Sequence, residues 1–179
     1  GEGGMGLVYK AEDIRLHRIV ALKFLSRELT CSEEAKRRFI REAQAASALD
    51  HPTVCTIYEV DETTDGTSFI AMAYCVGESL RQKIERGPLK LDEGIETAIQ
   101  ISNGLKKAHE SGIIHRDVKP ANVIIATDGQ AKIVDFGLAK LRGRTKLTKE
   151  RTTLGTIGYM SPEQARGEEV DHRTDIWSL

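Results

Sequence analysis

The chain has 179 residues, of which 40% are hydrophobic and 30% charged, and its formal net charge is -1. That composition indicates a soluble globular protein of one domain or two small lobes, and without a basic surplus there is no reason to expect nucleic acid as a partner. No apolar run reaches membrane-spanning length, and the three cysteines lack a CxxC spacing, which argues for reduced thiols and against a disulfide framework or a zinc site.

The first ten residues, GEGGMGLVYK, place four glycines in six positions and then become apolar and β-branched. Glycines can bring backbone N–H groups close to phosphate oxygens, but they can also form a tight turn that binds nothing. Residues 7–11 and 18–25 both have strand composition, and the polar segment between them predicts an antiparallel hairpin. Because the glycines precede a strand and not a helix, a dinucleotide-binding fold is disfavoured.

A charged pair is predicted from the next two elements. Alternation along residues 18–25 places Lys23 on the face that also carries Ile19, Ala21 and Leu25. A helix with Ser32 as its N-cap follows, and Glu42 lies on its apolar stripe. The other members of that stripe are Ala35, Phe39, Ala43, Ala46 and Leu49. A buried carboxylate is unfavourable unless it is paired, which makes Lys23 the natural partner of Glu42. The alternative is that Glu42 lies at the edge of the stripe and is solvated.

The rest of the chain changes from strand-rich to helix-rich. Residues 54–60 and 68–75 are predicted strands, whereas 77–87 and 91–112 contain predicted helices, so the boundary falls at Val76 and Gly77. A cleft between two such lobes is the default place for a ligand. The longer helix is expected to carry on one stripe the residues Ile95, Ala98, Ile99, Ser102, Leu105 and His109.

Short strands are predicted at 123–126 and 131–134, around the turn TDGQ, and they should form a hairpin. Matched strand lengths bring Asn122, just before the first strand, beside Asp135, just after the second. Amide and carboxylate oxygens are hard ligands suited to Mg²⁺, which keeps several waters and shares substrate phosphates. The loop leading into the same end carries two further charged residues, Asp117 and Lys119.

Five motifs stand in the order and spacing of the protein-kinase signature set: the opening GEGGMGLV, VALK at 20–23, HRDVKPAN at 115–122, DFG at 135–137 and SPE at 161–163. The chain therefore resembles the eukaryotic-like (Hanks-type) Ser/Thr protein kinases, and GxGGMGxVYKAxD with GTxxYMSPEQ is most similar to their bacterial members. The resemblance implies an α+β, bilobal fold. Residues 1–76 would form the N-terminal lobe, an antiparallel sheet plus one helix, and residues 77–179 an incomplete, mainly helical C-terminal lobe.

The resemblance also implies a binding site for ATP and Mg²⁺. The glycine loop would cover the phosphates, Lys23 would hold the α- and β-phosphates, and Glu42 would orient Lys23. Met72 would be the gatekeeper, and the backbone of Ala73 and Cys75 would bond the adenine edge. Nucleotide contacts are expected from Gly1, Gly3, Gly6, Val8, Ala21, Lys23, Met72, Ala73, Cys75 and Ile124.

The catalytic roles implied by the resemblance fall on the HRD and DFG segments. Asp117 would accept or position the proton of the substrate hydroxyl, and Lys119 would neutralise charge on the γ-phosphate. Asn122 and Asp135 would bind Mg²⁺. Lys119, two residues after Asp117, and Thr156 in GTIGYMSPE are similar to the Ser/Thr-specific kinases, so the expected acceptor is a serine or threonine of a protein.

The segment between DFG and SPE suggests regulation by phosphorylation. It offers the threonines Thr145, Thr148, Thr152, Thr153 and Thr156. In the family, a phosphate here is ordered by pairing with basic residues, which would be Arg38, Arg116 and Lys140. Thr152 and Thr153 are the favoured sites, whereas Thr156 is expected to serve as a structural and substrate-site hydroxyl. The alternative is that this threonine-rich loop is merely solvated.

Two other functions compete with the kinase interpretation. A non-catalytic scaffold or nucleotide sensor would be favoured by degraded lysine, base or metal positions, and none is degraded. A nicotinamide-dependent oxidoreductase is disfavoured by the strand that follows the glycines.

The resemblance finally carries expectations about the extent of the chain. The family's helical lobe continues past Leu179, so the chain is expected to be a truncated catalytic domain that exposes apolar surface. Asp175 would tie down the backbone of the HRD loop. The domain is expected in the cytoplasm, whether or not its parent protein is anchored in a membrane.

Overall fold

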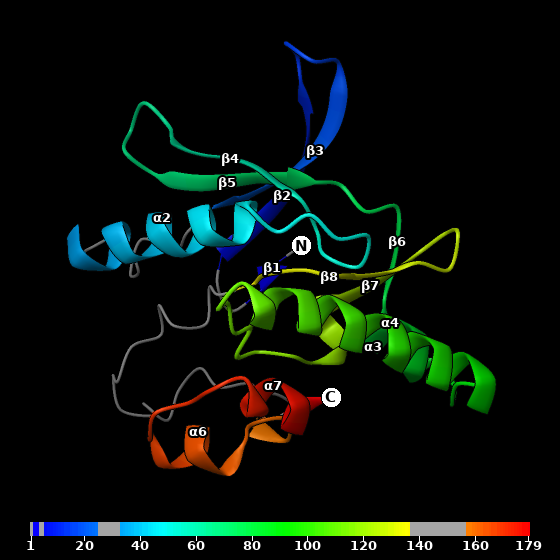
Figure 1. The fold of residues 1–179 in the computed structure, drawn as a ribbon. Helices are drawn as coiled ribbons and strands as arrows, with labels where there is room; N and C mark the ends of the chain where they lie inside the picture. The colour runs from blue at the N-terminus through cyan, green and yellow to red at the C-terminus, as the bar shows by residue number, and fades with distance from the viewer. Residues whose placement is uncertain (1, 4–5, 25–32, 137–156) are drawn as a thin grey trace. The chain divides into compact units, whose positions relative to one another are not determined.

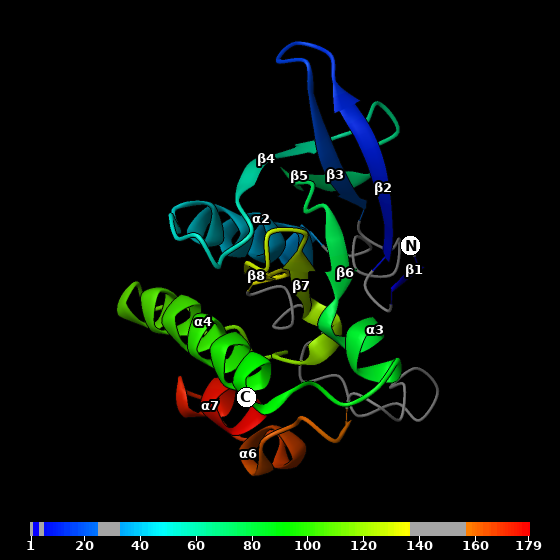
Figure 2. The ribbon, with the colours of Figure 1, turned by 90° about the vertical axis from the view of Figure 1, so that its right-hand side faces the viewer.

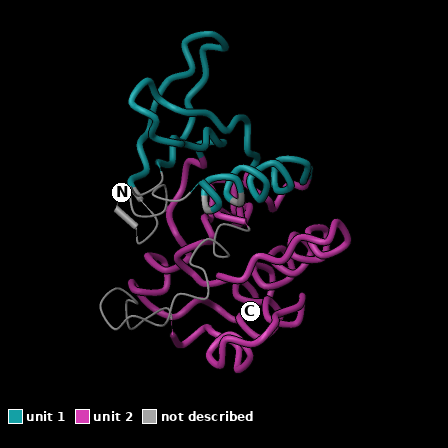
Figure 3. Tube along the Cα trace, turned by 90° about the vertical axis from the view of Figure 1, so that its left-hand side faces the viewer, with its two compact units in different colours: residues 1–50, 56–74 teal, residues 51–55, 75–179 magenta. Residues whose placement is uncertain are grey.

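The computed structural model describes residues 2–3, 6–24, 33–136 and 157–179. The chain forms two compact units (Figure 3). The first unit comprises residues 1–50 and 56–74, and the second unit comprises residues 51–55 and 75–179. Residues 51–55 therefore belong to the second unit, although the segments before and after them belong to the first.

The first unit is built on a five-stranded antiparallel sheet in the order β1-β2-β3-β5-β4 (Figure 1). β2 and β3 pair from Val8 opposite Lys23 to Asp13 opposite Arg18, which confirms the predicted hairpin and the strand after the glycines. The strands are β1 (Glu2–Gly3), β2 (Gly6–Asp13), β3 (Arg18–Phe24), β4 (Ile57–Glu62) and β5 (Ser68–Ala73).

One helix, α2 (Glu33–Ser47), accompanies this sheet beside β4 (Figure 1). Its acidic first turn, Glu33 and Glu34, suits the positive end of the helix dipole. An ion pair between Lys36 and Glu62 joins α2 to β4. The predicted stripe is confirmed at its described positions, since Phe39, Ala43, Ala46 and Leu49 are buried. The predicted N-cap, Ser32, lies outside the described residues.

The second unit combines a small sheet, in the order β6-β7-β8, with helices. α4 passes between the β7–β8 hairpin and the two C-terminal helices α6 and α7 (Figures 1 and 2). Among the described residues, no helix is long and apolar enough to cross a membrane. The elements are β6 (Gly77–Ser79), α3 (Leu80–Glu85), α4 (Leu91–Glu110), the 3₁₀ helix η1 (Pro120–Asn122), β7 (Val123–Ala126), β8 (Ala131–Ile133), α6 (Pro162–Arg166) and α7 (Arg173–Ser178).

β4 begins later than the strand predicted over 54–60. Cys55 and Val54 pair with β8 instead: the Cys55 N–H donates to the Ile133 carbonyl at 2.9 Å, and Val54 forms a parallel bridge with Ile133. Because these backbone groups have partners in the second unit, strand β4 of the first unit starts only at Ile57.

β6 was not predicted, because GES reads as the start of a helix. Its three residues are a strand only by pairing with β7, where Gly77 lies opposite Ala126 and Ser79 opposite Ile124. Ser79 then caps α3 by a reciprocal capping box with Gln82. A strand of three residues carries too little periodicity to be seen in the sequence.

The predicted stripe of α4 is buried only in part: Leu105 is buried and His109 is half-buried. The buried positions are Ile101, Gly104, Leu105 and Ala108, whereas Ile95 and Ile99 are 50% and 51% exposed. Both sets have helical spacing, so periodicity alone cannot choose between them. Gly104 favours this choice: a Cβ there would stand 3.0 Å from Ile133 Cδ1 and 3.2 Å from Thr53 Cβ, so glycine eases the close approach of the helix to β8.

The close approach of β6 to β7 gives a testable prediction. A Cβ on Gly77 would stand 2.1 Å from the Ile125 carbonyl oxygen and 2.8 Å from the Ala126 Cα, and both are backbone atoms. We expect Gly77→Ala to lower the free energy of unfolding by about 2 kcal/mol, measured by urea denaturation, because the two strands must separate.

Gly94→Ala is the matched control for that substitution. Gly94 lies in α4, and an added Cβ would meet nothing within 4 Å. The control should raise stability by about 0.5–1 kcal/mol, since alanine has the higher helix propensity. Equal free energies of unfolding for the two variants would contradict the steric argument.

Candidate functional site

Four of the predicted nucleotide contacts share one face of the first unit's sheet. Val8 lies opposite Lys23, and Ala21 lies opposite Met72. Directly opposed residues of an antiparallel pair point to the same side, as do Ala21 and Lys23, two positions apart on β3. Lys23 is only 6% exposed, as expected beside apolar neighbours. Its pairing with Glu42, which is half-buried on α2, stays a prediction.

The other predicted nucleotide contacts are divided between the units. Gly3 of β1 and Gly6 of β2 lie opposite each other in an antiparallel pair. Ala73 ends β5 and donates its backbone N–H at 2.9 Å to a carbonyl of the first unit. Cys75 and Ile124 belong to the second unit.

Several predicted functional residues fall outside the described residues, and their roles stay predictions. They are Gly1, Lys140, Thr145, Thr148, Thr152, Thr153 and Thr156.

Three predicted site residues of the second unit contact one another directly. The Lys119 ammonium donates to both carboxylate oxygens of Asp117, at 2.9 Å and 2.8 Å. The Asn122 amide nitrogen donates to the Asp117 carbonyl at 2.8 Å and to its Oδ2 at 3.0 Å. Lys119 and Asn122, which follow Asp117 by two and five residues, therefore hold its side chain in one rotamer. The 3₁₀ helix η1 is the turn that brings these residues together.

The β7–β8 hairpin brings Asn122 and Asp135 to the same end, as predicted. Val123 lies opposite Ile133, and the Val134 N–H donates to the Asn122 carbonyl at 2.9 Å. Asp135 follows directly, with a left-handed φ of 68°. Aspartate tolerates this conformation better than most residues, and strained backbone of this kind gathers at functional sites.

The chemistry of Asn122 and Asp135 fits a hard divalent cation. Both described hydrogen bonds of the Asn122 amide use its nitrogen, so Oδ1 is the atom of this amide that would bind a cation. The described part of the chain has no cluster of three or more His, Cys, Asp or Glu able to hold a metal. Two oxygen ligands suit Mg²⁺, which takes its remaining ligands from water and phosphate.

His115 joins the segment that carries Asp117 to the segment that carries Asp135. Its ring is fully buried; Nε2 lies 2.9 Å from the Val134 carbonyl, and Nδ1 accepts the Asp117 N–H at 3.2 Å. Since a carbonyl only accepts and an amide N–H only donates, the proton is on Nε2. The ring also packs edge-to-face on Phe136, with centroids 4.7 Å apart.

The expectation that Asp175 holds the backbone of the HRD loop is confirmed. Its carboxylate is fully buried and accepts the N–H groups of His115 and Arg116, at 2.8 Å and 2.7 Å. His109 of α4 donates its Nε2–H to the same carboxylate at 2.7 Å. One side chain from α7 thus fixes the loop that carries Asp117 and also ties that loop to α4.

Gln164 is a positioning residue that sequence reasoning missed. Its amide nitrogen donates to the Arg116 carbonyl at 2.8 Å, and its Oε1 accepts the Ser161 N–H at 3.0 Å. Arg116 has a left-handed φ of 66°, which is unfavourable for a long side chain and is offset by bonds to both its backbone groups. The capping-box pattern from Ser161 to Gln164 was visible in the sequence and could have identified α6.

A second chain of contacts joins α6 to α7. The buried hydroxyls of Ser161 and Thr174 are hydrogen-bonded, and Thr174 also donates to Glu163 Oε1 at 3.1 Å. The backbone N–H of Glu163, together with the Ser161 and Thr174 hydroxyls, lowers the pKa of its carboxyl. These bonds keep the SPE segment beside Asp175.

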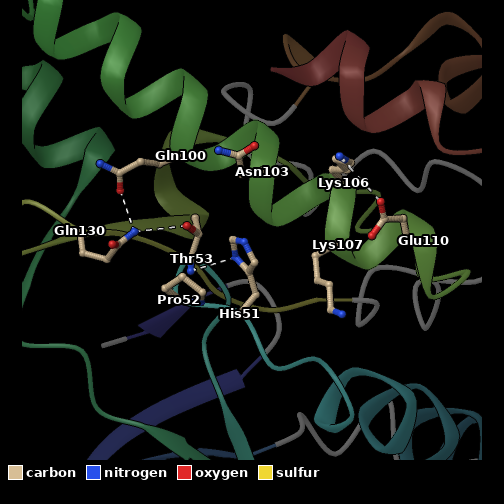
Figure 4. A pocket seen from close by; sticks show the side chains of 9 residues that line it. All are labelled: His51, Pro52, Thr53, Gln100, Asn103, Lys106, Lys107, Glu110 and Gln130. Atoms are coloured by element: carbon tan, nitrogen blue, oxygen red, sulfur yellow. Dashed lines mark hydrogen bonds and ion pairs between the residues drawn. The ribbon is translucent and has the colours of Figure 1, made fainter.

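A polar cavity of about 410 Å³ lies elsewhere in the second unit (Figure 4). It contains none of the predicted site residues. Gln130 crosses it and donates to Gln100 at 2.7 Å and to Thr53 at 3.2 Å. The lining residues are His51, Pro52, Thr53, Gln100, Asn103, Lys106, Lys107, Glu110 and Gln130.

Comparison with known proteins agrees with this geometry. The sequence profile described as "Protein kinase domain" matches residues 1–179. The chain is 42% identical to the serine/threonine-protein kinase PknB of Mycobacterium leprae over 184 residues, an alignment that covers 100% of this chain and 30% of that protein. It is 43% identical to the serine/threonine-protein kinase PrkC of Bacillus subtilis over 180 residues, which are 100% of this chain and 28% of PrkC.

A solved structure is also similar. The crystal structure of the Mycobacterium tuberculosis PknI kinase domain matches with a TM-score of 0.75 and 33% sequence identity, covering 98% of this chain and 66% of that one. The chain thus spans about a quarter to a third of the length of the curated relatives, with 26% and 34% in two examples.

Proposed function

The chain belongs to the protein kinase domain family, and from this premise we propose that it transfers the γ-phosphate of ATP to serine or threonine hydroxyls of proteins. Members of the family use ATP with a divalent metal, and the relatives above are serine/threonine-protein kinases. The observation that carries the proposal is the contact cluster of Asp117, Lys119 and Asn122, at the end of the hairpin that leads to Asp135.

The expected α+β fold of the family is confirmed by the likeness to a solved kinase domain. Within it, we assign ATP binding to residues 1–76 and the catalytic loop, activation segment and start of the central helix to residues 77–179. The face shared by Val8, Ala21, Lys23 and Met72 supports the first assignment, since it combines one buried cation with apolar neighbours suited to phosphate and adenine.

Asp117 is the group that would take or position the proton of the acceptor hydroxyl. It is a carboxylate whose rotamer is fixed by Lys119 and Asn122 before substrate binds. Phosphoryl transfer depends mainly on positioning and on stabilising charge. Lys119 and Asn122 would therefore contribute to the rate by holding the Asp117 carboxylate in place before substrate binds. Lys119 carries the positive charge that would meet the γ-phosphate.

Mg²⁺ is the metal that we propose, held by Asn122 Oδ1 and the Asp135 carboxylate. When bound, it would neutralise phosphate charge and hold the β- and γ-phosphates in place. Among the nucleotide contacts, Gly1, Gly3 and Gly6 would approach the phosphates, and the backbone of Ala73 and Cys75 together with Ile124 would contact the adenine.

Regulation by autophosphorylation of Thr152 or Thr153 is part of the same proposal, with Thr156 at the substrate site. A phosphate there would pair with basic side chains and order the loop. Arg116 supports this, because its backbone is fixed by Asp175 and Gln164 in a conformation that an arginine rarely adopts.

A metal titration tests the proposal at Asn122. Phosphate incorporation from ATP into a generic Ser/Thr protein substrate should require about 10–100-fold more Mg²⁺ for half-maximal rate in Asn122→Ala than in the unchanged chain. The matched control is Asn103→Ala, which removes an exposed amide on α4 and should leave the requirement unchanged. An unchanged requirement in Asn122→Ala would overturn the ligand assignment.

The same assay separates the kinase from a nucleotide-sensing scaffold. If the folded chain binds ATP but transfers no phosphate to itself or to the substrate at any Mg²⁺ concentration, the sensor becomes the better interpretation. Incorporation on serine and threonine alone, identified by peptide mapping, would support the proposed acceptor class.

A further inference from the structure

Two of the cysteines, far apart in sequence, lie against each other in the second unit. The sulfur atoms of Cys55 and Cys75 are 4.0 Å apart, within range of an S–H···S contact, and neither residue is in a disulfide. Cys55 is buried, with 7% exposed, whereas Cys75 is half-buried. A disulfide needs its sulfurs at about 2.0 Å, so the two sulfur atoms must come closer by about 2 Å to form one.

The backbone on both sides of the pair holds these thiols together. The Cys55 N–H donates to the Ile133 carbonyl of β8 at 2.9 Å, and the carbonyl of Val76, next to Cys75, accepts the Thr127 N–H at 3.1 Å. Both cysteine segments are thus anchored to the β7–β8 hairpin. The Ala73 N–H also donates to the carbonyl of Thr56 at 2.9 Å, joining the residues that flank the pair. The proximity is therefore built into the fold.

The two thiols differ in ionisation. A hydrogen bond from the Cys55 thiol, helped by the positive charge of Lys132 and opposed by burial, lowers the pKa of Cys75 to about 7. The same contact and burial raise the pKa of Cys55. Cys75 is thus the thiol that ionises first and becomes the reactive thiolate, while Cys55 keeps its proton and lies beside it.

We propose that Cys55 and Cys75 are a redox modification site at which peroxide forms a reversible disulfide. The Cys75 thiolate attacks one oxygen of hydrogen peroxide; the O–O bond breaks, hydroxide leaves and takes a proton to become water, and Cys75 becomes a sulfenic acid. Cys55 then loses its proton, its sulfur attacks the Cys75 sulfur, and the S–O bond breaks with release of a second water. Two thiols are oxidised by two electrons, and one peroxide is reduced to two waters.

The position of the cysteine pair in the chain determines which segments a disulfide would link. Cys55 is the last residue of the second unit before the chain enters β4, and Cys75 is the first after it leaves β5. A disulfide would therefore tie together two of the connections between the units. This chemistry does not depend on the proposed function, so its test and the kinase assay fail separately.

Peroxide treatment of the full chain tests the proposal. Cys31→Ser removes the third cysteine, and any remaining thiols are alkylated before intact-mass measurement and peptide mapping without reductant. We expect a mass lower by about 2 Da, a cross-linked peptide pair that contains both cysteines, and reversal by dithiothreitol. Cys55→Ala should abolish the cross-link and leave Cys75 as a sulfenic acid trapped by dimedone. Two unmodified thiols, or a cross-link only between molecules, would overturn the proposal.

A second readout keeps the proposal falsifiable if the cross-link is missed. The rate of Cys75 alkylation by iodoacetamide should rise with pH through a midpoint near 7. In Cys55→Ala the hydrogen-bond donor is lost, so the rate at pH 7 should fall about tenfold as the midpoint moves toward the ordinary thiol value. Identical profiles in the two proteins would show that the thiols do not interact.

Discussion

Asp117→Asn should lower the rate of phosphate transfer by about 10²–10⁴-fold while ATP binding is kept, because the carboxylate that we propose takes or positions the hydroxyl proton is lost. The substitution is nearly isosteric, but the new amide would turn an N–H₂ group toward donors. Lys119 Nζ now donates to both oxygens of Asp117, and the Asn122 amide donates to Oδ2. In Asp117→Asn, one of these contacts would bring two hydrogen-bond donors face to face. The side chains of Lys119 and Asn122 would therefore also lose their fixed positions.

The measurement is phosphate incorporation into a Ser/Thr protein substrate, followed by intact mass, with ATP binding determined separately. Asp128→Asn is the matched control, since Asp128 is exposed in the turn of the β7–β8 hairpin and, within the described part of the chain, accepts one hydrogen bond, from the Gln130 N–H at 2.9 Å. The control should transfer phosphate at the unchanged rate. Near-normal transfer by Asp117→Asn, or loss of ATP binding together with transfer, would refute the assigned role.

Asp175→Asn should lower the free energy of unfolding by about 3 kcal/mol, the second large effect. The Asp175 carboxylate is fully buried and accepts three hydrogen bonds, from the backbone of His115 and Arg116 and from the His109 ring. An amide in its place has one acceptor oxygen, so at least one buried N–H must face another donor. Removing one partner from a buried charged network is among the most destabilising substitutions known.

Urea unfolding measures this effect. Trp177 is the only tryptophan of the chain and lies in α7, two residues from Asp175, so its fluorescence reports on the helix that carries the substitution. Far-UV circular dichroism reports on the whole chain. Asp128→Asn again serves as control and should change stability by about 0.5 kcal/mol or less. A loss below about 1 kcal/mol for Asp175→Asn would mean that the three bonds contribute little.

Asp117→Asn tests the chemical step at the proposed site, and Asp175→Asn tests the backbone that positions Asp117. Asp117 acts through atoms that would meet the substrate, whereas Asp175 acts through the backbone that positions Asp117. Asp175→Asn should therefore lower transfer as well, and the loss should be partly restored by conditions that stabilise the fold. Asp117→Asn should show no such recovery, because its defect is chemical and not conformational.

Local sequence patterns predicted the structure correctly where residues close together in the sequence determine it. The β2–β3 hairpin and the β7–β8 hairpin followed from alternation and turn composition, and matched strand lengths placed Asn122 beside Asp135. The α2 stripe followed from one uninterrupted period of apolar residues. The motifs identified the family, because five short patterns in order exclude chance.

Contacts between distant residues decided the rest, and no local pattern encodes them. α4 has apolar residues on two faces at helical spacing. The face of Ile101 and Gly104 packs toward β8, whereas Ile95 is exposed. Val54 and Cys55 left the predicted strand because their backbone partners lie on β8, nearly 80 residues away in sequence. The proximity of Cys55 and Cys75 and the buried bonds of Asp175 arise in the same way. By itself the sequence determined the family and most of the elements, and it predicted the residues of the chemistry. Only tertiary packing decided which faces are buried and which partners hold the loop that carries Asp117, because burial and hydrogen-bond satisfaction are properties of the assembled chain.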